Sequence, residues 1–172
     1  MRTLYLLRHA KSSWDEPGLD DHDRPLSGRG RRAAALIGSY LHGRGIRPDL
    51  VLCSSAKRAR ETFRRVAECL GGDGPEVRYE RALYLADSGR LLELVRAAPD
   101  EALALMLVGH NEGLPQLALR LAGDALGDAR ERLMAKFPTA ALAVLTFDAP
   151  SWRGITDGAG RLVAVVTPKQ LA

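Results

Sequence analysis

The sequence predicts an α/β fold in which a mostly parallel sheet lies between two layers of helices. Apolar runs at residues 3–7 and 103–109 have the length and composition of strands that are buried on both faces of a sheet. Between such runs the apolar residues recur at helical spacing, so predicted strands and helices alternate along the chain. This alternation favours a three-layer α/β/α sandwich, and 172 residues suit a single domain, which is expected to span residues 1–172.

The first half of the chain predicts two strands, each followed by a helix. The first strand leads into the polar, Asp-rich segment 14–24, which contains prolines and is expected to be an irregular loop. Ser27 is expected to cap a helix over residues 28–42, where glycines follow. A second strand over residues 49–53 leads into a helix over residues 56–70, which a Gly-Gly pair terminates.

The second half predicts the rest of the sheet and the helices that cover it. A helix is expected to begin at Asp87, a residue type that commonly caps helices, and to stop before Pro99. The last two apolar runs flank a turn-rich segment, so they predict a hairpin on one side of the sheet. The further expected elements are strands at residues 76–79, 103–108, 140–147 and 162–166 and helices near residues 113–122 and 128–135.

Composition and charge exclude several classes of protein. No apolar segment reaches the roughly 18 residues that a membrane span requires, so no membrane partner is expected. The net charge is +4, but the basic residues are spread along the chain without an aromatic-interleaved patch, so no nucleic acid partner is expected. The N-terminus enters a strand pattern without a charged leader and apolar region, which predicts a cytoplasmic protein. Cys53 and Cys69 are expected not to form a disulfide.

Two histidines and two arginines follow predicted strands at the points where the strands end. Arg8 and His9 come directly after the first strand, Arg58 lies just after the second, and His110 follows the run at residues 103–109. Because the carboxyl ends of parallel strands meet at one edge of a sheet, these side chains are expected to converge on one anion site. In phosphoryl transfer, cations hold the phosphoryl oxygens, and a neutral imidazole can be the nucleophile when a hydrogen bond holds its other nitrogen. His9 and His110 fit complementary roles of this kind.

Three segments give the sequence a specific resemblance to a known family. They are Leu-Leu-Arg-His-Ala at residues 6–10, Ser-Ser-Ala-Lys-Arg-Ala-Arg-Glu-Thr at residues 54–62, and Val-Gly-His-Asn at residues 108–111. In order and spacing they resemble the motifs of the histidine phosphatase superfamily, also called phosphoglycerate mutase-like, and within it the short SixA-type branch of phosphohistidine phosphatases. The segment at residues 23–30 also resembles the stretch that opens the first helix in this branch, and the resemblance covers nearly the whole chain.

The resemblance implies a phosphatase with a covalent intermediate and a phosphoglycerate mutase-like fold. It implies that His9 attacks phosphorus in line and becomes phosphorylated, after which water hydrolyses the phosphoenzyme. It also implies that Arg8 and Arg58 bind the phosphoryl oxygens and that His110 donates a hydrogen bond to a nonbridging oxygen. The arginines take the place of the magnesium that other phosphotransferases use, so no metal or other cofactor is expected.

The substrate that fits this resemblance best is phosphohistidine in a protein. Members that act on phosphate esters supply a carboxylic acid to protonate the alcohol, whereas neither Glu80 nor Asp87 aligns with that acid. The imidazole of phosphohistidine can leave without a separate acid to protonate it, because the pKa of an imidazole lies near neutral pH. The chain also lacks a long insertion that would build a lid, so an open cleft for a protein surface is expected. Ala10 and Lys11 stand where many members have Gly and an acidic residue, and Lys11 adds positive charge near the site.

Other functions and contacts stay open at this point. The same site could hydrolyse small phosphate esters, or the chain could be a phosphoprotein-binding module without turnover, although such a module needs no nucleophile. Ser12, Ser13 and Asn111 lie beside the motif residues and could contact phosphate. Asp23 and Arg24 could orient the first helix or contact substrate, and the first of these roles is favoured. The sequence leaves the oligomeric state open.

Overall fold

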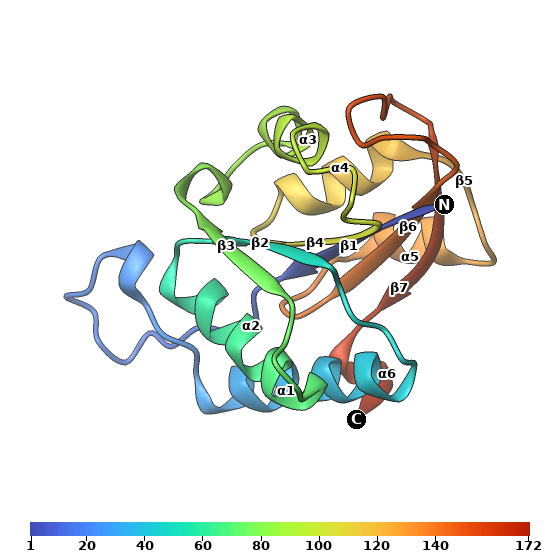
Figure 1. The fold of residues 1–172 in the computed structure, drawn as a ribbon. Helices are drawn as coiled ribbons and strands as arrows, with labels where there is room; N and C mark the ends of the chain where they lie inside the picture. Colours follow the sequence, from blue (N-terminus) through green and yellow to red (C-terminus); the bar gives the residue numbers. More distant parts are fainter.

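A computed structural model describes residues 1–172, and a seven-stranded sheet forms its centre (Figure 1). The strands are β1 (Arg2–Arg8), β2 (Leu50–Ser54), β3 (Glu76–Glu80), β4 (Ala104–Gly109), β5 (Ala122–Ala125), β6 (Leu142–Phe147) and β7 (Gly160–Val166). Their order across the sheet is β3-β2-β4-β1-β6-β7-β5. β6 runs antiparallel to both of its neighbours, and all other neighbouring pairs are parallel. The prediction of a mostly parallel sheet is therefore confirmed, as is the hairpin that β6 and β7 form.

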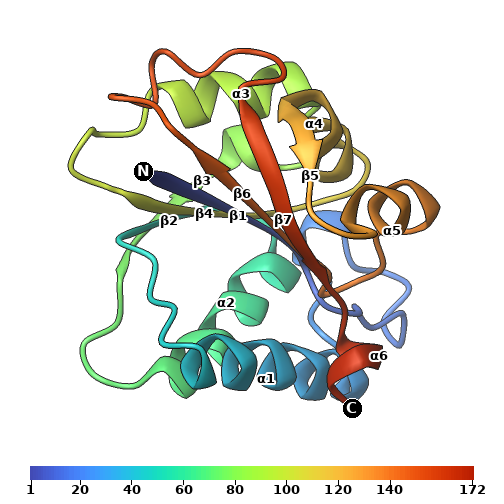
Figure 2. The same cartoon turned by 90° about the vertical axis from the view of Figure 1, so that its right-hand side faces the viewer.

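Helices cover both faces of this sheet, as a three-layer sandwich requires. They are α1 (Gly28–Gly43), α2 (Lys57–Leu70), α3 (Ser88–Arg96), α4 (Gly113–Leu121), α5 (Ala129–Ala135) and α6 (Pro168–Leu171), with short 3₁₀ turns at Asp21–Asp23 and Arg81–Leu83. α1, α2 and α6 lie on one face and α3 and α4 on the other, with α5 beside α4 (Figures 1 and 2). No helix combines the length and the apolar character that crossing a bilayer requires.

The two faces of the central strand β1 contact two separate hydrophobic clusters. Leu4 and Leu6 are fully buried with residues of α3 and α4, whereas Leu7 is buried with residues of α1 and α2. Because successive side chains of a strand point to opposite faces, covering both faces favours apolar residues at every position. The strand is therefore visible in the sequence as a continuous apolar run. Cys53 belongs to the second cluster and Cys69 lies in α2, and both are free thiols, as predicted.

Two short elements were not predicted from the sequence. The helix expected near residues 113–122 ends at Leu121, and the residues that follow it pair with β7 as strand β5. Their sequence, Ala-Gly-Asp-Ala, lacks an apolar run, and a Cβ atom on Gly123 would overlap the Gly158 carbonyl. A close approach of two backbones, which leaves no periodic pattern in a sequence, thus makes this edge strand. The other element, α6, is a single helical turn capped by Thr167.

The first turn of α1 is joined to the chain segment that follows β1. Ser27 caps the helix, because its hydroxyl oxygen accepts a hydrogen bond from the Gly30 N–H over 3.0 Å. The N–H and the hydroxyl of Ser27 both donate to the Lys11 carbonyl, over 2.9 and 3.1 Å. A Cβ atom on Gly30 would overlap that same carbonyl, so the close approach requires glycine. α1 thereby holds the backbone just beyond His9.

We predict that Gly30→Ala lowers the free energy of unfolding by about 1–3 kcal/mol, because α1 or the Lys11 carbonyl must move to accommodate the added methyl group. Gly43→Ala is the matched control in the same helix, since a Cβ atom there has no heavy atom within 4 Å. Urea unfolding of the two variants measures the difference. Equal free energies of unfolding would contradict the close packing described for Gly30.

Candidate active site

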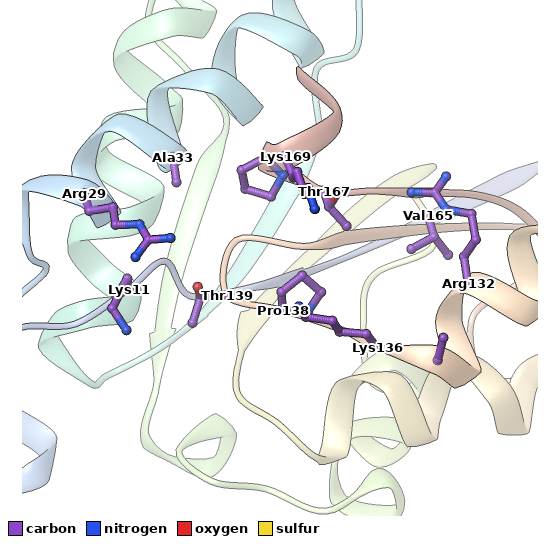
Figure 3. Close-up of a pocket in the computed structure, with 12 residues that line it drawn as sticks. Lys11, Arg29, Ala33, Arg132, Lys136, Pro138, Thr139, Val165, Thr167 and Lys169 are labelled. Atoms are coloured by element: carbon purple, nitrogen blue, oxygen red, sulfur yellow. The ribbon is translucent and has the colours of Figure 1, made fainter. Parts of the chain in front are cut away.

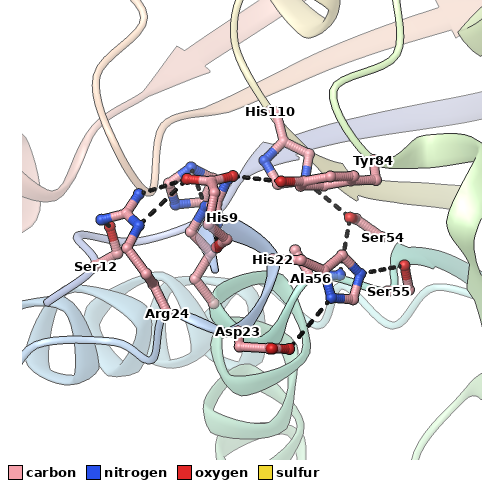
Figure 4. A network of polar contacts seen from close by, with 12 residues as sticks. His9, Ser12, His22, Asp23, Arg24, Ser54, Ser55, Ala56, Tyr84 and His110 are labelled. Atoms are coloured by element: carbon pink, nitrogen blue, oxygen red, sulfur yellow. Dashed lines mark hydrogen bonds and ion pairs between the residues drawn. The ribbon is translucent and has the colours of Figure 1, made fainter. Parts of the chain in front are cut away.

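The carboxyl ends of β1, β2 and β4 surround a cavity of about 310 Å³ that contains the four side chains singled out in the sequence. Arg8, His9, Arg58 and His110 all line it. The rings of His9 and His110 lie close to each other (Figure 4). Their centroids are 5.2 Å apart. We call this space the histidine cavity. Its other lining residues are Lys11, Ser12, Trp14, Arg24, Leu85, Asn111 and Thr139. The edge of the sheet therefore gathers side chains that are far apart in the sequence.

His9 is held with one ring nitrogen hydrogen-bonded to the backbone and the other facing Arg58. Its backbone N–H donates to the Gly109 carbonyl over 2.9 Å, which places it beside the end of β4. Nδ1 lies 2.7 Å from the Ala10 carbonyl oxygen, and since that oxygen can only accept, Nδ1 carries the proton. Nε2 therefore carries the lone pair, and Arg58 Nε, which can only donate, lies 3.4 Å from it. This tautomer leaves a nucleophilic nitrogen in the cavity.

Burial keeps both histidines neutral. Burial is the main reason that the pKa of His9 is lowered to about 4, and the Arg58 and Arg8 cations lower it further. The hydrogen bond to the Ala10 carbonyl acts in the opposite direction and raises this pKa. Burial likewise lowers the pKa of His110 to about 3, and His9 and Arg58 act in the same direction. Both imidazoles are therefore uncharged at neutral pH, so a proton does not block the lone pair of His9.

One ring nitrogen of His110 has no hydrogen-bond partner within the protein. Its Nε2 lies 2.8 Å from the Ser54 hydroxyl oxygen, which itself accepts the Ala56 N–H over 3.2 Å. With the Ser54 hydroxyl proton directed to Nε2, the proton of the neutral His110 ring lies on Nδ1. This Nδ1 is buried without a partner, as are Arg8 Nε and Asn111 Oδ1 in the same cavity. Buried polar atoms that lack partners indicate a place where a polar ligand binds.

Two arginines flank the pair of histidines. Arg58 is 3% exposed, and its terminal nitrogens donate to the Asp21 carbonyl over 2.6 Å and to the Asp21 carboxylate over 2.9 Å. Arg8 donates to the Phe137 carbonyl over 3.2 Å, and burial together with the Arg58 cation lowers the pKa of Arg8. The two guanidinium groups repel each other, and an anion held between them would relieve this repulsion.

Asp21 is the carboxylate that pairs with Arg58 and Arg24, and it was not singled out in the sequence. It accepts hydrogen bonds from Arg58, from Arg24 over 3.3 Å, and from the Tyr84 hydroxyl. Although burial by itself would raise the pKa of Asp21, the hydrogen bonds from Tyr84 and Arg58 and the nearby cations lower it to about 2. Asp21 is therefore an anion at neutral pH and a poor proton donor. The Asp-rich segment 14–24 indicates in the sequence that a carboxylate lies near the site, but the sequence alone does not show which carboxylate of this segment contacts Arg58.

The residues beside the motifs differ in their positions. Ser12 and Asn111 line the histidine cavity, whereas Ser13 does not, and its hydroxyl oxygen accepts the Asp15 N–H over 3.1 Å. Arg24, for which substrate contact was the other open role, lines the cavity and donates to the Ser12 hydroxyl over 2.8 Å. Arg24 thus adds a third guanidinium group to the wall of the histidine cavity.

Other carboxylates near the motifs lie outside the histidine cavity. Neither Glu80 nor Asp87 lines it, and Asp87 instead caps α3 by accepting a backbone N–H over 2.9 Å. Asp23 lies 3.6 Å from the ring of His22, which hydrogen-bonds to the Ser55 hydroxyl over 2.8 Å. Figure 4 shows this group beside the histidine cavity. The cavity lining itself therefore contains cations, imidazoles and neutral side chains.

Thr62 joins the segment after β1 to α2. Its hydroxyl oxygen accepts the Ala10 N–H over 2.9 Å, and its hydroxyl proton is donated to the Arg58 carbonyl over 2.7 Å. Thr62 is fully buried, so without the hydroxyl the Ala10 N–H would lack an acceptor. One side chain thus fixes the position of the residue after His9 relative to the backbone of Arg58.

Comparison with known proteins identifies relatives of this chain. The family model described as histidine phosphatase superfamily (branch 1) matches residues 4–135. An uncharacterized protein of Mycobacterium tuberculosis is 39% identical over 165 residues, which cover 95% of this chain and 100% of the relative. A 2,3-bisphosphoglycerate-dependent phosphoglycerate mutase of Chelativorans sp. is 35% identical over 91 residues, which cover 52% of this chain and 44% of the relative.

Solved structures share the fold over nearly the whole length. A "putative phosphohistidine phosphatase SixA" from Nakamurella multipartitia has a TM-score of 0.84 at 31% identity, and the match covers 97% of this chain and 96% of that one. A protein of the same description from Agrobacterium tumefaciens has a TM-score of 0.77 at 32% identity, covering 97% of this chain and 98% of that one. The predicted phosphoglycerate mutase-like fold and the resemblance to the SixA type are thereby confirmed.

We predict that Thr62→Val lowers the free energy of unfolding by about 1–3 kcal/mol, because it leaves the buried Ala10 N–H without an acceptor in nearly the same volume. Thr62→Ser keeps the hydroxyl and is the matched control, expected to lose only the packing of one methyl group. Denaturant unfolding compares the two variants. A valine variant as stable as the serine variant would show that the hydroxyl does not hold this segment.

The pKa values of the buried histidines predict a loss of stability toward acid. The folded pKa values, about 4 for His9 and about 3 for His110, lie below the 6.5 of an ordinary histidine, so the unfolded chain binds more protons as the pH falls. The free energy of unfolding is therefore expected to decrease from about pH 6.5 down to about pH 4. The free energy of unfolding is expected to decrease less across this pH range for His110→Asn than for His42→Asn. His42→Asn is the matched control, because it removes an exposed histidine. Equal slopes for the two variants would contradict a neutral, buried His110.

Proposed function

We infer that this chain, which belongs to the histidine phosphatase superfamily (branch 1) and is of the SixA type, hydrolyses a phosphorylated substrate through a phosphohistidine on its own His9. The observation that carries the proposal is the unprotonated Nε2 of a neutral His9, placed in one cavity with His110, Arg8 and Arg58. We take residues 1–172 as one catalytic domain.

In the first step, the lone pair of His9 Nε2 attacks phosphorus in line with the leaving group. A bond forms between Nε2 and phosphorus while the bond from phosphorus to the substrate nitrogen breaks, and an imidazole protonated at its other nitrogen departs as a neutral ring. Burial favours this step, because a pKa of about 4 keeps His9 unprotonated well below neutral pH. The Ala10 carbonyl stabilises the positive charge that the ring acquires, since it accepts the Nδ1 proton.

In the second step, water attacks the phosphoryl group on His9. The bond between phosphorus and Nε2 breaks, its electron pair returns to Nε2, and the protons of the water remain with phosphate and solvent. Arg8 and Arg58 hold the phosphoryl oxygens in both steps, and His110 Nδ1 donates a hydrogen bond to one of them. For this, Arg58 exchanges the Asp21 carboxylate for the phosphoryl group. Because side chains supply the positive charge, we propose that the reaction needs no metal ion.

The side chains around the cavity favour phosphohistidine in a protein as the substrate. An alcohol leaving group requires a proton donor, but Asp21 has a pKa of about 2, and Glu80 and Asp87 lie outside the cavity. A protonated imidazole leaving group requires none, because it departs as a neutral ring. Trp14 lines the cavity with 71% of its surface exposed, which supports an open entrance that a protein surface can approach. The SixA-type relatives support the same class of substrate.

Hydrolysis of small phosphate esters at the same site is the second candidate function. The partial identity to a phosphoglycerate mutase favours it. The two candidates differ in their need for an acid, so Glu80→Gln and Asp87→Asn should lower turnover only if the substrate is an ester and one of these carboxylates donates a proton. Turnover of a phosphohistidine peptide and of an alkyl phosphate by the two variants separates the candidates.

We predict that brief mixing with a radiolabelled phosphohistidine peptide leaves acid-labile label on His9, and that His9→Ala abolishes both label and turnover.

Arg58→Ala is expected to lower turnover by a factor on the order of 10²–10³, as for the loss of one oxyanion donor. Arg153→Ala, which removes an exposed arginine outside the cavity, is the matched control and should keep wild-type turnover. Turnover should also survive a metal chelator.

Two results would contradict this proposal. Turnover that persists in His9→Ala would exclude His9 as the nucleophile. A wild-type chain that binds the peptide but shows neither label nor turnover would be a phosphoprotein-binding module instead.

A further inference from the structure

A second cavity, of about 540 Å³, lies beside the histidine cavity, and its charged lining is entirely positive (Figure 3). We call it the basic cavity. Its cations are Lys11 after β1, Arg29 in α1, Arg132 in α5, Lys136 after α5 and Lys169 in α6. No aspartate or glutamate lines it. Five cations from four separate segments thus face one space, where they repel each other unless an anion lies among them.

None of these five cations is neutralised within the protein. The eight ion pairs of the structure all involve other basic residues. In the histidine cavity, by contrast, Arg24 and Arg58 both pair with Asp21. The positive charge of the basic cavity is therefore not compensated within the chain, and a bound anionic ligand would compensate it.

The balance of arginine and lysine differs between the two cavities, since Lys11 is the one lysine of the histidine cavity, whereas Arg29 and Arg132 accompany three lysines in the basic cavity. Arg8, Arg24 and Arg58 line the histidine cavity, and the planar guanidinium group of arginine matches the oxygens of a phosphoryl group. The whole chain has only four lysines, yet three of them line the basic cavity. A lysine ammonium is a compact charge on a flexible stem, which suits carboxylates at varying positions along a peptide. The charge and flexibility of this lining complement carboxylates, which the Asp and Glu residues of a protein supply.

The two cavities adjoin each other. Lys11 and Thr139 line both of them, and Lys11 lies only two residues beyond His9 in the sequence. Figure 3 shows Lys11 and Arg29 on one side of the basic cavity and Lys136 on the opposite side. A substrate whose phosphoryl group reaches His9 therefore also lies close to Lys11 and to the basic cavity.

We propose that the basic cavity binds an acidic segment of the phosphorylated protein, a stretch of Asp and Glu residues that lies beside the phosphohistidine. The inference rests on the proposed function, because it takes the phosphoryl group to be bound in the histidine cavity. Binding of the acidic segment raises the affinity of the chain for phosphorylated proteins that carry such a segment, and it aligns their phosphohistidine with His9. The chemistry stays in the histidine cavity, and the basic cavity selects the substrate.

Two phosphohistidine peptides that differ only in charge test this inference. One carries Asp and Glu residues beside the phosphohistidine, and the other carries Asn and Gln at the same positions. For the wild-type chain, kcat/KM is expected to be about tenfold higher for the acidic peptide, as a few exposed ion pairs allow. This ratio should shrink as the salt concentration rises, because salt screens exposed charges.

The double variant Lys136→Gln/Lys169→Gln is expected to reduce the ratio of the two kcat/KM values to about two, because it removes two of the cations that attract the acidic peptide. The matched control is Arg44→Gln/Arg153→Gln, which removes the same charge outside both cavities. This control is expected to keep the wild-type ratio. An equal effect of the two double variants would overturn the inference, as would equal kcat/KM values of the wild-type chain for both peptides.

An acidic peptide without phosphate separates a failure of this inference from a failure of the proposed function. Its binding, measured by fluorescence anisotropy, is expected to weaken in Lys136→Gln/Lys169→Gln and to persist in the control variant. If no phosphohistidine peptide is turned over but this pattern of binding is found, the proposed function is wrong and the acidic-segment site stands. Absence of binding together with absence of turnover would overturn both. A preference for a small bisphosphorylated ester that the Lys136/Lys169 variant abolishes would assign the cavity to a small molecule and overturn the inference.

Discussion

The hydrogen bond from His9 Nδ1 to the Ala10 carbonyl determines which nitrogen of the ring is free to react, and the proposed chemistry depends on it. The backbone around this carbonyl is held from two sides, by Thr62 at the Ala10 N–H and by Ser27 at the Lys11 carbonyl. The sheet thus determines where His9 lies, and two helices determine how the segment after it is held. α1 and α2 serve the site in this way although neither supplies its nucleophile.

Burial then sets the charges around that nitrogen. It keeps His9 and His110 neutral, while the arginines beside them remain cations, so the cavity attracts an anion without a protonated imidazole. Asp21 holds the Arg58 guanidinium in the structure, and in the proposed reaction a phosphoryl group competes for the same nitrogens. The proposal therefore couples phosphate binding to the position of the loop around Asp21. The cations of the basic cavity extend this positive surface along one side of the site, where we propose that the substrate is selected.

The sequence predicts the parts of the molecule that depend on local patterns. Strands buried on both faces leave continuous apolar runs, and the residues directly after those runs, such as His9 and His110, are therefore visible in the sequence. Strand β5 is not visible, because it depends on the approach of Gly123 to the distant Gly158 backbone. The contact of Asp21 with Arg58 and the gathering of lysines at the basic cavity are likewise products of the fold, since they join segments with no periodic relation in the sequence. Arg8, His9, Arg58 and His110, which were predicted from the sequence, line one cavity, and this geometry supports the catalytic roles proposed for them.

The position of phosphorus on the His9 ring tests the central claim most directly. The phosphoenzyme can be trapped in alkali from protein that carries isotope-labelled histidine, and NMR coupling between phosphorus and the ring nitrogens identifies the bonded atom. The account predicts a bond to Nε2 of His9, because the Ala10 carbonyl holds the proton on Nδ1. Phosphorus bonded to Nδ1 of His9, or to His110, would contradict it.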